Sequence, residues 1–151
     1  MSNYILDTNI ISALGAEEEE EGGVISDRLY GLSDSDNVSI SILTLYEENY
    51  GLKNTNDEER RERFQKNLDS VQQFFYVIPL DIKEMEIYAD LKIAYKNHTG
   101  ISKKDAKKND IDLLIASTAI ALDATLVSND RIFKTLSEID SRLKYENWLM
   151  S

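Results

Sequence analysis

The chain has 151 residues, a length that suits one domain with a two- or three-layer hydrophobic core. It contains no cysteine, which excludes disulfides, thiolate metal sites and cysteine catalysis. Its formal net charge of −11 argues against a generic nucleic-acid coat protein or repressor, because attraction to phosphates needs clustered Lys and Arg. A nuclease is less affected by this objection, since bound metal can neutralise its acids.

The negative charge is concentrated in residues 1–52, which hold eleven acids and a single base, Arg28. The start, Met1-Ser2-Asn3, lacks the basic segment and apolar run of a signal peptide, and no apolar stretch is long enough to span a bilayer. We therefore expect a soluble cytoplasmic protein that does not bind membranes.

The first third of the chain predicts two strands with helical segments between them. Residues 3–6 are an apolar strand, and a helical pattern of apolar residues follows over 10–14. The five glutamates at 17–21, with two glycines after them, predict a solvated loop closed by helix breakers. A short helix is expected over 24–32, and the period-two alternation of 38–42 is typical of a strand.

Two helices are predicted next. The first begins at Thr44 and runs through Tyr50, with Gly51 as its C-cap. The second is long and amphipathic, is capped by Asn56 or Asp57, and presents apolar residues up to Phe75. Its polar face is either simply solvated or contacts RNA, and carries Arg60, Arg61, Arg63 and Lys66.

The rest of the chain continues this alternation. In order, the pattern predicts a strand at 76–80, a helix at 81–95, a polar lysine-rich connection at 97–109, a very apolar helix at 111–122, a strand at 124–128 and a helix at 132–139. Strands that alternate with helices are typical of a parallel sheet. We therefore predict a single α/β domain over residues 1–151, in three layers (α/β/α) around a central, mostly parallel sheet.

Four acids occupy related positions in this scheme. Asp7 and Asp130 come directly after strands, Glu47 lies in the helix after a strand, and Asp112 opens the apolar helix. In a right-handed α/β sheet these places lie along one edge, the carboxyl ends of the strands, where such sheets bind ligands. Four carboxylates there would repel one another unless a cation or proton lay between them. Without histidine or cysteine the cluster favours Mg²⁺ or Mn²⁺.

Each acid also has a purely structural interpretation. Asp7 could cap the helix that follows it, and Asp110 or Asp112 could cap the apolar helix at 111–122. Asp130 could lie in a turn or at an N-cap. Glu47 lies three residues after Thr44, the spacing of a capping box. It is the joint placement of the four that favours a metal site.

Other catalytic centres find little support. His98 is the only histidine and lies in a polar segment far in sequence from any nucleophile-elbow motif, which argues against a Ser-His-Asp triad. Neither a Walker A motif nor GxGxxG occurs. Asp7 could be an aspartyl nucleophile for phosphoryl transfer. Haloacid-dehalogenase phosphatases carry a second acid two residues later, but this chain has Asn9 at that position.

At this point the chain resembles a known family. LDTNIISAL at 6–14, SILTLYEENYGL at 41–52, NDIDLLIASTAIALDATLVSND at 109–130 and ENW at 146–148 look like PIN-domain ribonucleases, and within them the VapC-type toxins of toxin–antitoxin pairs. The resemblance implies that Asp7, Glu47, Asp112 and Asp130 form the metal site and that Asn9 and Ser128 support it. It also implies a homodimer, a small antitoxin, and RNA products with a 5′-phosphate and a 3′-hydroxyl.

Two features depart from the family pattern. Glu48 follows Glu47 where the family usually has an apolar residue, so the ligand could be either; adjacent side chains on a helix diverge by about 100°, and only one can face the site. We choose Glu47 for its spacing to Thr44 and Gly51. The second departure is the glutamate run at 17–21, which would repel RNA near a cleft.

The expected activity is metal-assisted hydrolysis of RNA phosphodiesters, in which one or two Mg²⁺ or Mn²⁺ ions activate a water and neutralise developing charge. A cluster of lysines just before Asp112 could guide the phosphates or merely balance local acids: Lys103, Lys104, Lys107 and Lys108. The alternative is a catalytically silent PIN fold that binds RNA or a protein partner.

Overall fold

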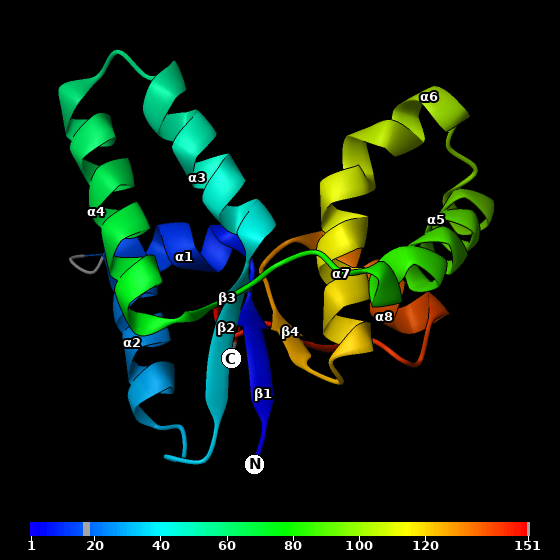
Figure 1. Ribbon diagram of the computed structural model, residues 1–151, viewed down its shortest axis with the longest axis horizontal. Helices are drawn as coiled ribbons and strands as arrows, with labels where there is room; N and C mark the ends of the chain where they lie inside the picture. Colours follow the sequence, from blue (N-terminus) through cyan, green and yellow to red (C-terminus); the bar gives the residue numbers. More distant parts are fainter. Residues whose placement is uncertain (17–18, 151) are drawn as a thin grey trace.

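The computed structural model describes residues 1–16 and 19–150. Its centre is a parallel five-stranded sheet in the order β3-β2-β1-β4-β5 (Figure 1). The strands are β1 (Asn3–Leu6), β2 (Asn37–Ser41), β3 (Tyr76–Ile78), β4 (Thr125–Val127) and β5 (Lys144–Glu146). In the middle of the sheet, Ile5 of β1 is in register with Ser39 of β2 and Leu126 of β4.

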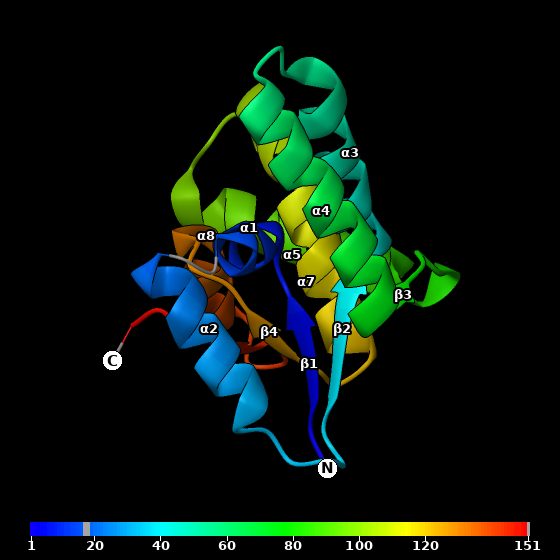
Figure 2. The same cartoon turned by 90° about the vertical axis from the view of Figure 1, so that its left-hand side faces the viewer.

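Helices cover both faces of the sheet, as Figures 1 and 2 show. They are α1 (Thr8–Gly15), α2 (Glu20–Tyr30), α3 (Ile42–Asn54), α4 (Glu58–Phe74), α5 (Met85–Thr99), α6 (Lys103–Ala106), α7 (Asp110–Ala121) and α8 (Arg131–Ile139). Two 3₁₀ turns, η1 (Ile82–Glu84) and η2 (Lys107–Asn109), precede α5 and α7. The predicted three-layer α/β/α fold with a parallel sheet is confirmed.

The two faces of the sheet have separate hydrophobic cores. On one face α7 and α8 pack against the sheet around Leu113, Leu126 and Phe133, which are fully buried. On the other face α1 and α2 pack around Ile10 and Ile25. Burying apolar side chains on both faces is what a parallel sheet requires, because its strands have no solvated side. None of the described helices is long and apolar enough to cross a membrane.

Three local predictions are wrong. Gly22 and Gly23 do not close a loop but lie inside α2, which begins at Glu20; Glu17 and Glu18 of the predicted loop lie outside the described residues. A Cβ at Gly22 would lie 2.5 Å from the Ala16 carbonyl oxygen, so this glycine allows α2 to pack closely. Gly51 is not a C-cap either: α3 continues to Asn54.

The polar connection predicted at 97–109 is largely helical. The helix α5 extends to Thr99 and ends at Gly100, whose left-handed backbone (φ 69°) suits glycine. Ser102 then caps α6 by accepting a hydrogen bond from the Asp105 N–H, and η2 leads into α7. The strand β5 lies in the tail, where no strand was predicted.

Candidate active site

The four predicted acids lie at the carboxyl edge of the sheet. Asp7 immediately follows β1, and its N–H donates to the Val127 carbonyl of β4 (2.9 Å). Asp130 caps α8 after β4, Asp112 lies in the first turn of α7, and Glu47 lies in α3, which continues directly from β2. Figure 1 shows α3 and α4 on one side of this edge and α6 and α7 on the other, projecting past the strand ends.

Asp7 is the most enclosed of the four acids, with only 4% of its surface exposed. Burial raises its pKa to about 6, and the nearby charges of Glu47 and Asp130 act in the same direction. The Ser128 hydroxyl donates a 2.9 Å hydrogen bond to Asp7 Oδ2 and partly opposes this shift. Asp7 is therefore a carboxylate that the fold holds out of water, and none of the described residues forms an ion pair with it.

Asp112 shows the same effect more strongly. Burial first, and then the charges of Asp7, Asp130 and Glu47, raise its pKa to about 7. Each of the other three predicted acids thus lies close enough to Asp112 to repel it. The structure brings all four into one electrostatic cluster.

Hydrogen bonds fix the side chains around Asp7. Asn9 Nδ2 donates to Ser128 Oγ (3.2 Å), and the N–H of Asp130 donates to the same hydroxyl oxygen (3.0 Å). The Asn129 N–H donates to Asn9 Oδ1 (3.2 Å). The two residues predicted as supports, Asn9 and Ser128, therefore connect Asp7 to the turn that carries Asp130.

The sequence analysis missed one residue of this network, Thr8. Its hydroxyl donates a short hydrogen bond of 2.6 Å to Glu47 Oε1 and lies 3.2 Å from the Thr44 hydroxyl. Thr8 thereby joins the start of α1 to α3. Its position directly after Asp7 was the available signal, but adjacency alone does not distinguish a positioning hydroxyl from an ordinary first-turn residue.

The structure separates Glu47 from Glu48. Glu48 is 1% exposed, points between helices and accepts a hydrogen bond from the Ser12 hydroxyl (3.2 Å), while its Oε2 has no partner. Burial raises the pKa of Glu48. Glu47, not Glu48, is the one whose charge acts on both Asp7 and Asp112. This orientation supports Glu47 as the member of the acid cluster.

Of the four acids, only one has the helix-capping role that was the structural alternative. Glu47 belongs to no capping box, because α3 begins at Ile42 and Ser41 is its cap. Asp7 occupies the N-cap position of α1 but its side chain makes no capping bond, and the N-cap of α7 is Asn109, not Asp112. Only Asp130 also caps a helix, by accepting from the Ile132 N–H (3.2 Å).

The donor set is suited to a hard cation. It consists of carboxylates, with hydroxyl and amide groups around them, and it contains no thiol or imidazole. Oxygen ligands of this kind are the ones that Mg²⁺ and Mn²⁺ prefer. Within residues 1–16 and 19–150, no three acidic or histidine side chains stand close enough together to enclose an ion as they are placed. A cation would have to draw the carboxylates inward against their mutual repulsion, which it would relieve.

The predicted lysines lie next to this edge but do not pair with the acids. Lys103 and Lys104 are exposed on α6, and Lys107 and Lys108 are exposed on η2, immediately before α7. Lys108 forms an ion pair with Asp105 (3.7 Å). Their contact with RNA stays a prediction. His98 is exposed in the last turn of α5, a position that gives it no catalytic partner among the four acids.

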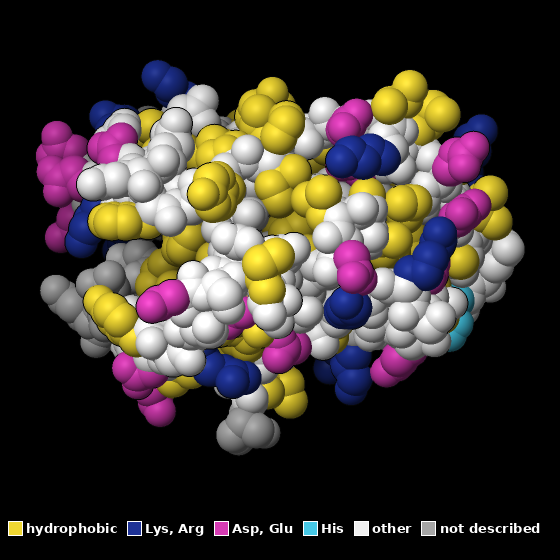
Figure 3. Space-filling view, turned by 60° about the horizontal axis from the view of Figure 1, so that its bottom comes forward, with side chains coloured by type: hydrophobic (Ala, Val, Ile, Leu, Met, Phe, Trp, Pro, Cys, Tyr) yellow, Lys and Arg dark blue, Asp and Glu magenta, His cyan; other side chains and the backbone are white. Residues whose placement is uncertain are grey.

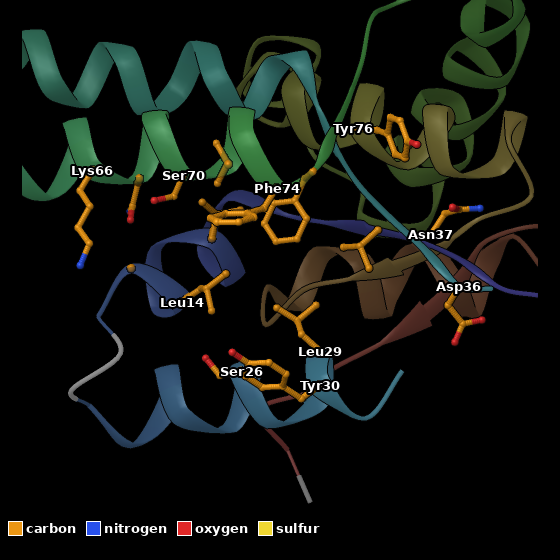
Figure 4. Close-up of a pocket in the computed structure, with 16 residues that line it drawn as sticks. Leu14, Ser26, Leu29, Tyr30, Asp36, Asn37, Lys66, Ser70, Phe74 and Tyr76 are labelled. Carbon is orange, nitrogen blue, oxygen red and sulfur yellow. The ribbon is translucent and has the colours of Figure 1, made fainter. Parts of the chain in front are cut away.

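A separate cavity lies elsewhere on the molecule. About 590 Å³ in volume, it is formed between α1, α2, α4 and β2, and Leu14, Leu29 and Phe74 point into it (Figure 4). Figure 3 shows a hollow with hydrophobic side chains on this side of the molecule, among interspersed acidic and basic groups. None of the four acids lines the cavity, so it is a separate surface and not the site of their chemistry.

Comparisons with known proteins agree with the fold. The PIN domain family matches residues 4–139. The chain is 30% identical over 138 residues to Ribonuclease VapC of Rickettsia bellii (90% of this chain, 92% of the relative) and 31% identical over 146 residues to Ribonuclease VapC2 of Rickettsia felis (96% and 97%).

Solved structures show the same architecture. The crystal structure of VapBC2 from Rickettsia felis bound to a DNA fragment from their promoter contains a chain that is 29% identical, with a TM-score of 0.74 and coverage of 97% of this chain and 98% of that one. FitAcB from Neisseria gonorrhoeae, 22% identical with a TM-score of 0.74 over 98% and 99%, shares the fold. The chain therefore belongs to the PIN-domain family, among relatives that are VapC ribonucleases.

Proposed function

We propose that this protein is a Mg²⁺- or Mn²⁺-dependent endoribonuclease that hydrolyses RNA phosphodiester bonds at the carboxyl edge of its sheet. The observation that carries the proposal is the cluster of Asp7, Glu47, Asp112 and Asp130, which raises the pKa of Asp112 to about 7 and of Asp7 to about 6. Clustered carboxylates with this perturbation mark functional sites, because structural acids are normally paired. The names of the Rickettsia relatives support the ribonuclease assignment.

The chain's own residues would divide the work as follows. The four acids would hold the cation, with Asp7 oriented by the Ser128 hydroxyl and Glu47 by the Thr8 hydroxyl. Asn9 keeps Ser128 in place, and the capping bond of Asp130 fixes its carboxylate at the start of α8. These residues would hold a cation that, when bound, would supply Lewis-acid activation of water and neutralise charge on the phosphate.

A cleavage assay tests the proposal. We expect the purified protein to cut a pool of structured RNAs with Mg²⁺ or Mn²⁺, to stop when EDTA is added, and to lose activity in Asp7→Asn, a variant that keeps the shape of the side chain. Circular dichroism of the variant checks its fold. Cleavage by the metal-free protein would contradict the mechanism, and RNA binding without any cleavage would favour the silent binding module.

We also propose that the protein is a homodimeric cytoplasmic toxin restrained by a small antitoxin. The Rickettsia felis neighbour belongs to VapBC2, whose structure is bound to a DNA fragment from their promoter. Expression of this chain alone should stop growth, and co-expression of a small neighbouring open reading frame with a basic DNA-binding N-terminus should restore it. Light scattering of the purified chain measures the oligomer; a monomeric mass would contradict the dimer.

A further inference from the structure

A small polar hollow between α1 and α4 takes no part in the chemistry described so far. Its volume is about 200 Å³, and it is lined by Ser12, Arg60, Arg63, Phe64 and Asn67. The two arginines belong to the basic face of α4, for which the sequence left open both simple solvation and contact with RNA.

The walls of the hollow are fixed by close packing. Asn67 is 7% exposed and lies against Gly15 of α1, where any Cβ would collide with its amide. Phe64 lies over Gly51 of α3, where a Cβ would come within 2.6 Å of the ring. Two glycines therefore allow α4 to approach α1 and α3 closely enough to form a rigid floor.

The rim of the hollow carries two unused positive charges. Arg60 and Arg63 are both exposed and, three residues apart on a helix, lie on one face. Among the residues that the structure describes, neither guanidinium forms an ion pair. Arg61 differs, because its guanidinium donates to the Thr55 carbonyl (3.0 Å) on another side of the helix.

The hollow adjoins the acid cluster. Thr8 binds Glu47, and one turn further along α1 Ser12 binds Glu48, the neighbour of Glu47. Four helical residues rise about 6 Å, so the hollow begins roughly that far from the acids.

We propose that this hollow binds a backbone phosphate of the single-stranded RNA substrate, one that flanks the phosphate undergoing cleavage. The inference rests on the proposed ribonuclease function and specifies how that site holds its substrate. Two guanidinium groups offer planar pairs of donors that match phosphate oxygens. The Phe64 ring supplies the apolar wall against which a sugar or base packs. This site compensates for the acidity of the rest of the chain.

A charge-matched pair of variants tests the site. Arg60→Ala/Arg63→Ala removes the two arginines of the hollow, and Arg61→Ala/Lys66→Ala removes two charges from the same helix outside it. Both are made with Asp7→Asn to prevent cleavage, and binding of a fluorescein-labelled 12-nucleotide single-stranded RNA is measured by anisotropy across a salt series. We expect the first double variant to bind about tenfold more weakly, with a salt slope shallower by about 0.7 per lost phosphate contact, and the control within about twofold.

Several results would overturn the site. Equal losses in both variants would show a general charge effect, and unchanged binding in the first would show that the arginines are not used. An oligoglutamate peptide that competes as well as RNA would assign the hollow to an acidic protein partner instead.

A second readout separates the site from the proposed function. In the active protein, Arg60→Ala/Arg63→Ala should raise the KM for RNA and leave kcat within about threefold, because the interaction is equal in ground and transition states. If the parent protein neither binds nor cuts RNA, both the function and this site fail. If the parent cuts RNA and the two double variants behave alike, only the site fails.

Discussion

Two aspartates of one helix lie in opposite electrostatic environments. Asp110 and Asp112 both lie in the first turn of α7. Asp110 accepts hydrogen bonds from Lys92 Nζ and the Tyr88 hydroxyl, both at 2.8 Å, and Lys92 lowers its pKa. Asp112 has no such partner, and burial among other acids raises its pKa to about 7. An aspartate thus stabilises the fold at position 110, whereas an aspartate at position 112 is repelled by the acids around it.

This difference favours a role for the acid cluster in binding a ligand over a role in stabilising the fold. Two acids that stabilise the fold have a cationic donor: Asp110 pairs with Lys92, and Asp140 pairs with Arg142 (2.7 Å). Asp7 and Asp112 receive none, although both are enclosed. The cation that we propose for this site would relieve the repulsion.

The largest expected effect separates these two aspartates directly. Asp112→Asn should reduce RNA cleavage by more than about 100-fold, because even outer partners of metal ligands contribute 10–100-fold. Asp110→Asn makes the same chemical change two residues away and should keep activity within about threefold. Initial rates at saturating Mn²⁺ measure both. Comparable losses in the two variants would mean that the start of α7, and not the carboxylate of Asp112, is what cleavage needs.

Glu47 and Glu48 extend the comparison to neighbouring residues. Glu47→Gln should weaken Mn²⁺ binding and slow cleavage by roughly 10- to 100-fold. Glu48→Gln should leave cleavage within about threefold and should not lower the melting temperature, because a neutral amide no longer buries a charge whose Oε2 lacks a partner. Isothermal titration with Mn²⁺ and thermal melts measure these effects. The reverse pattern would move the ligand to Glu48.

Stability without metal should depend on pH in a direction set by the cluster. The pKa values of Asp7 and Asp112 rise on folding to about 6 and about 7, from about 3.9 in the unfolded chain. The folded state therefore binds more protons between pH 4 and 7, and the free energy of unfolding falls as pH rises through that range. At about 1.4 kcal/mol for each pKa unit, the two rises set an upper bound of about 7 kcal/mol, and solvent screening of the partly exposed Asp112 lowers the expected decrease to a few kcal/mol.

Urea denaturation in EDTA at several pH values measures this decrease, and Asp7→Asn/Asp112→Asn should abolish it. Asp110 and Asp140, whose pKa values are lowered, titrate below this range and contribute at lower pH. Mn²⁺ should stabilise the wild type more at pH 7.5 than at pH 5, because protons compete for the same carboxylates. If the free energy of unfolding of the metal-free wild type rose from pH 4 to 7 by more than that of the double variant, the predicted repulsion would be disproved.

The fold was largely predictable because its elements alternate with clear periodicity. What failed depended on contacts between distant segments. Gly22 and Gly51 were predicted as breakers or caps, yet they lie inside helices where a neighbouring backbone or ring comes too close for a Cβ. Lys144–Glu146 has two charged residues in three, and pairs as β5 only because the edge of β4 is available.

The location of the acids was predictable from strand ends, but their environment was not. Nothing in the spacing shows that Lys92 reaches Asp110 from another helix, or that the Ser12 hydroxyl draws Glu48 away from the cluster. Thr8 likewise becomes important only through Glu47, which lies 39 residues away in the chain. Such partners are set by helix packing, which the sequence pattern does not reveal.

The smallest effect is expected from the lysines before α7. These lysines are exposed next to the acid cluster but do not pair with it. They can contribute to binding only if the RNA strand passes close enough for its phosphates to reach them. Replacement of all four by alanine should weaken RNA binding by about three- to tenfold and flatten its salt dependence by at most about 2.8 in slope, which is 0.7 for each phosphate contact. The variant carries changes at Lys103, Lys104, Lys107 and Lys108.

A control of equal charge decides whether position or net charge is responsible. Four lysines on other elements serve for it: Lys53 of α3, Lys83 of η1, Lys96 of α5 and Lys134 of α8. Long-range attraction is screened within about 8–10 Å at physiological salt, so lysines remote from the bound strand should have little effect there and a larger one at low salt. If both quadruple variants lose the same affinity at physiological salt, the lysines of α6 and η2 only balance the local acids, and the acidic edge must hold RNA by other contacts.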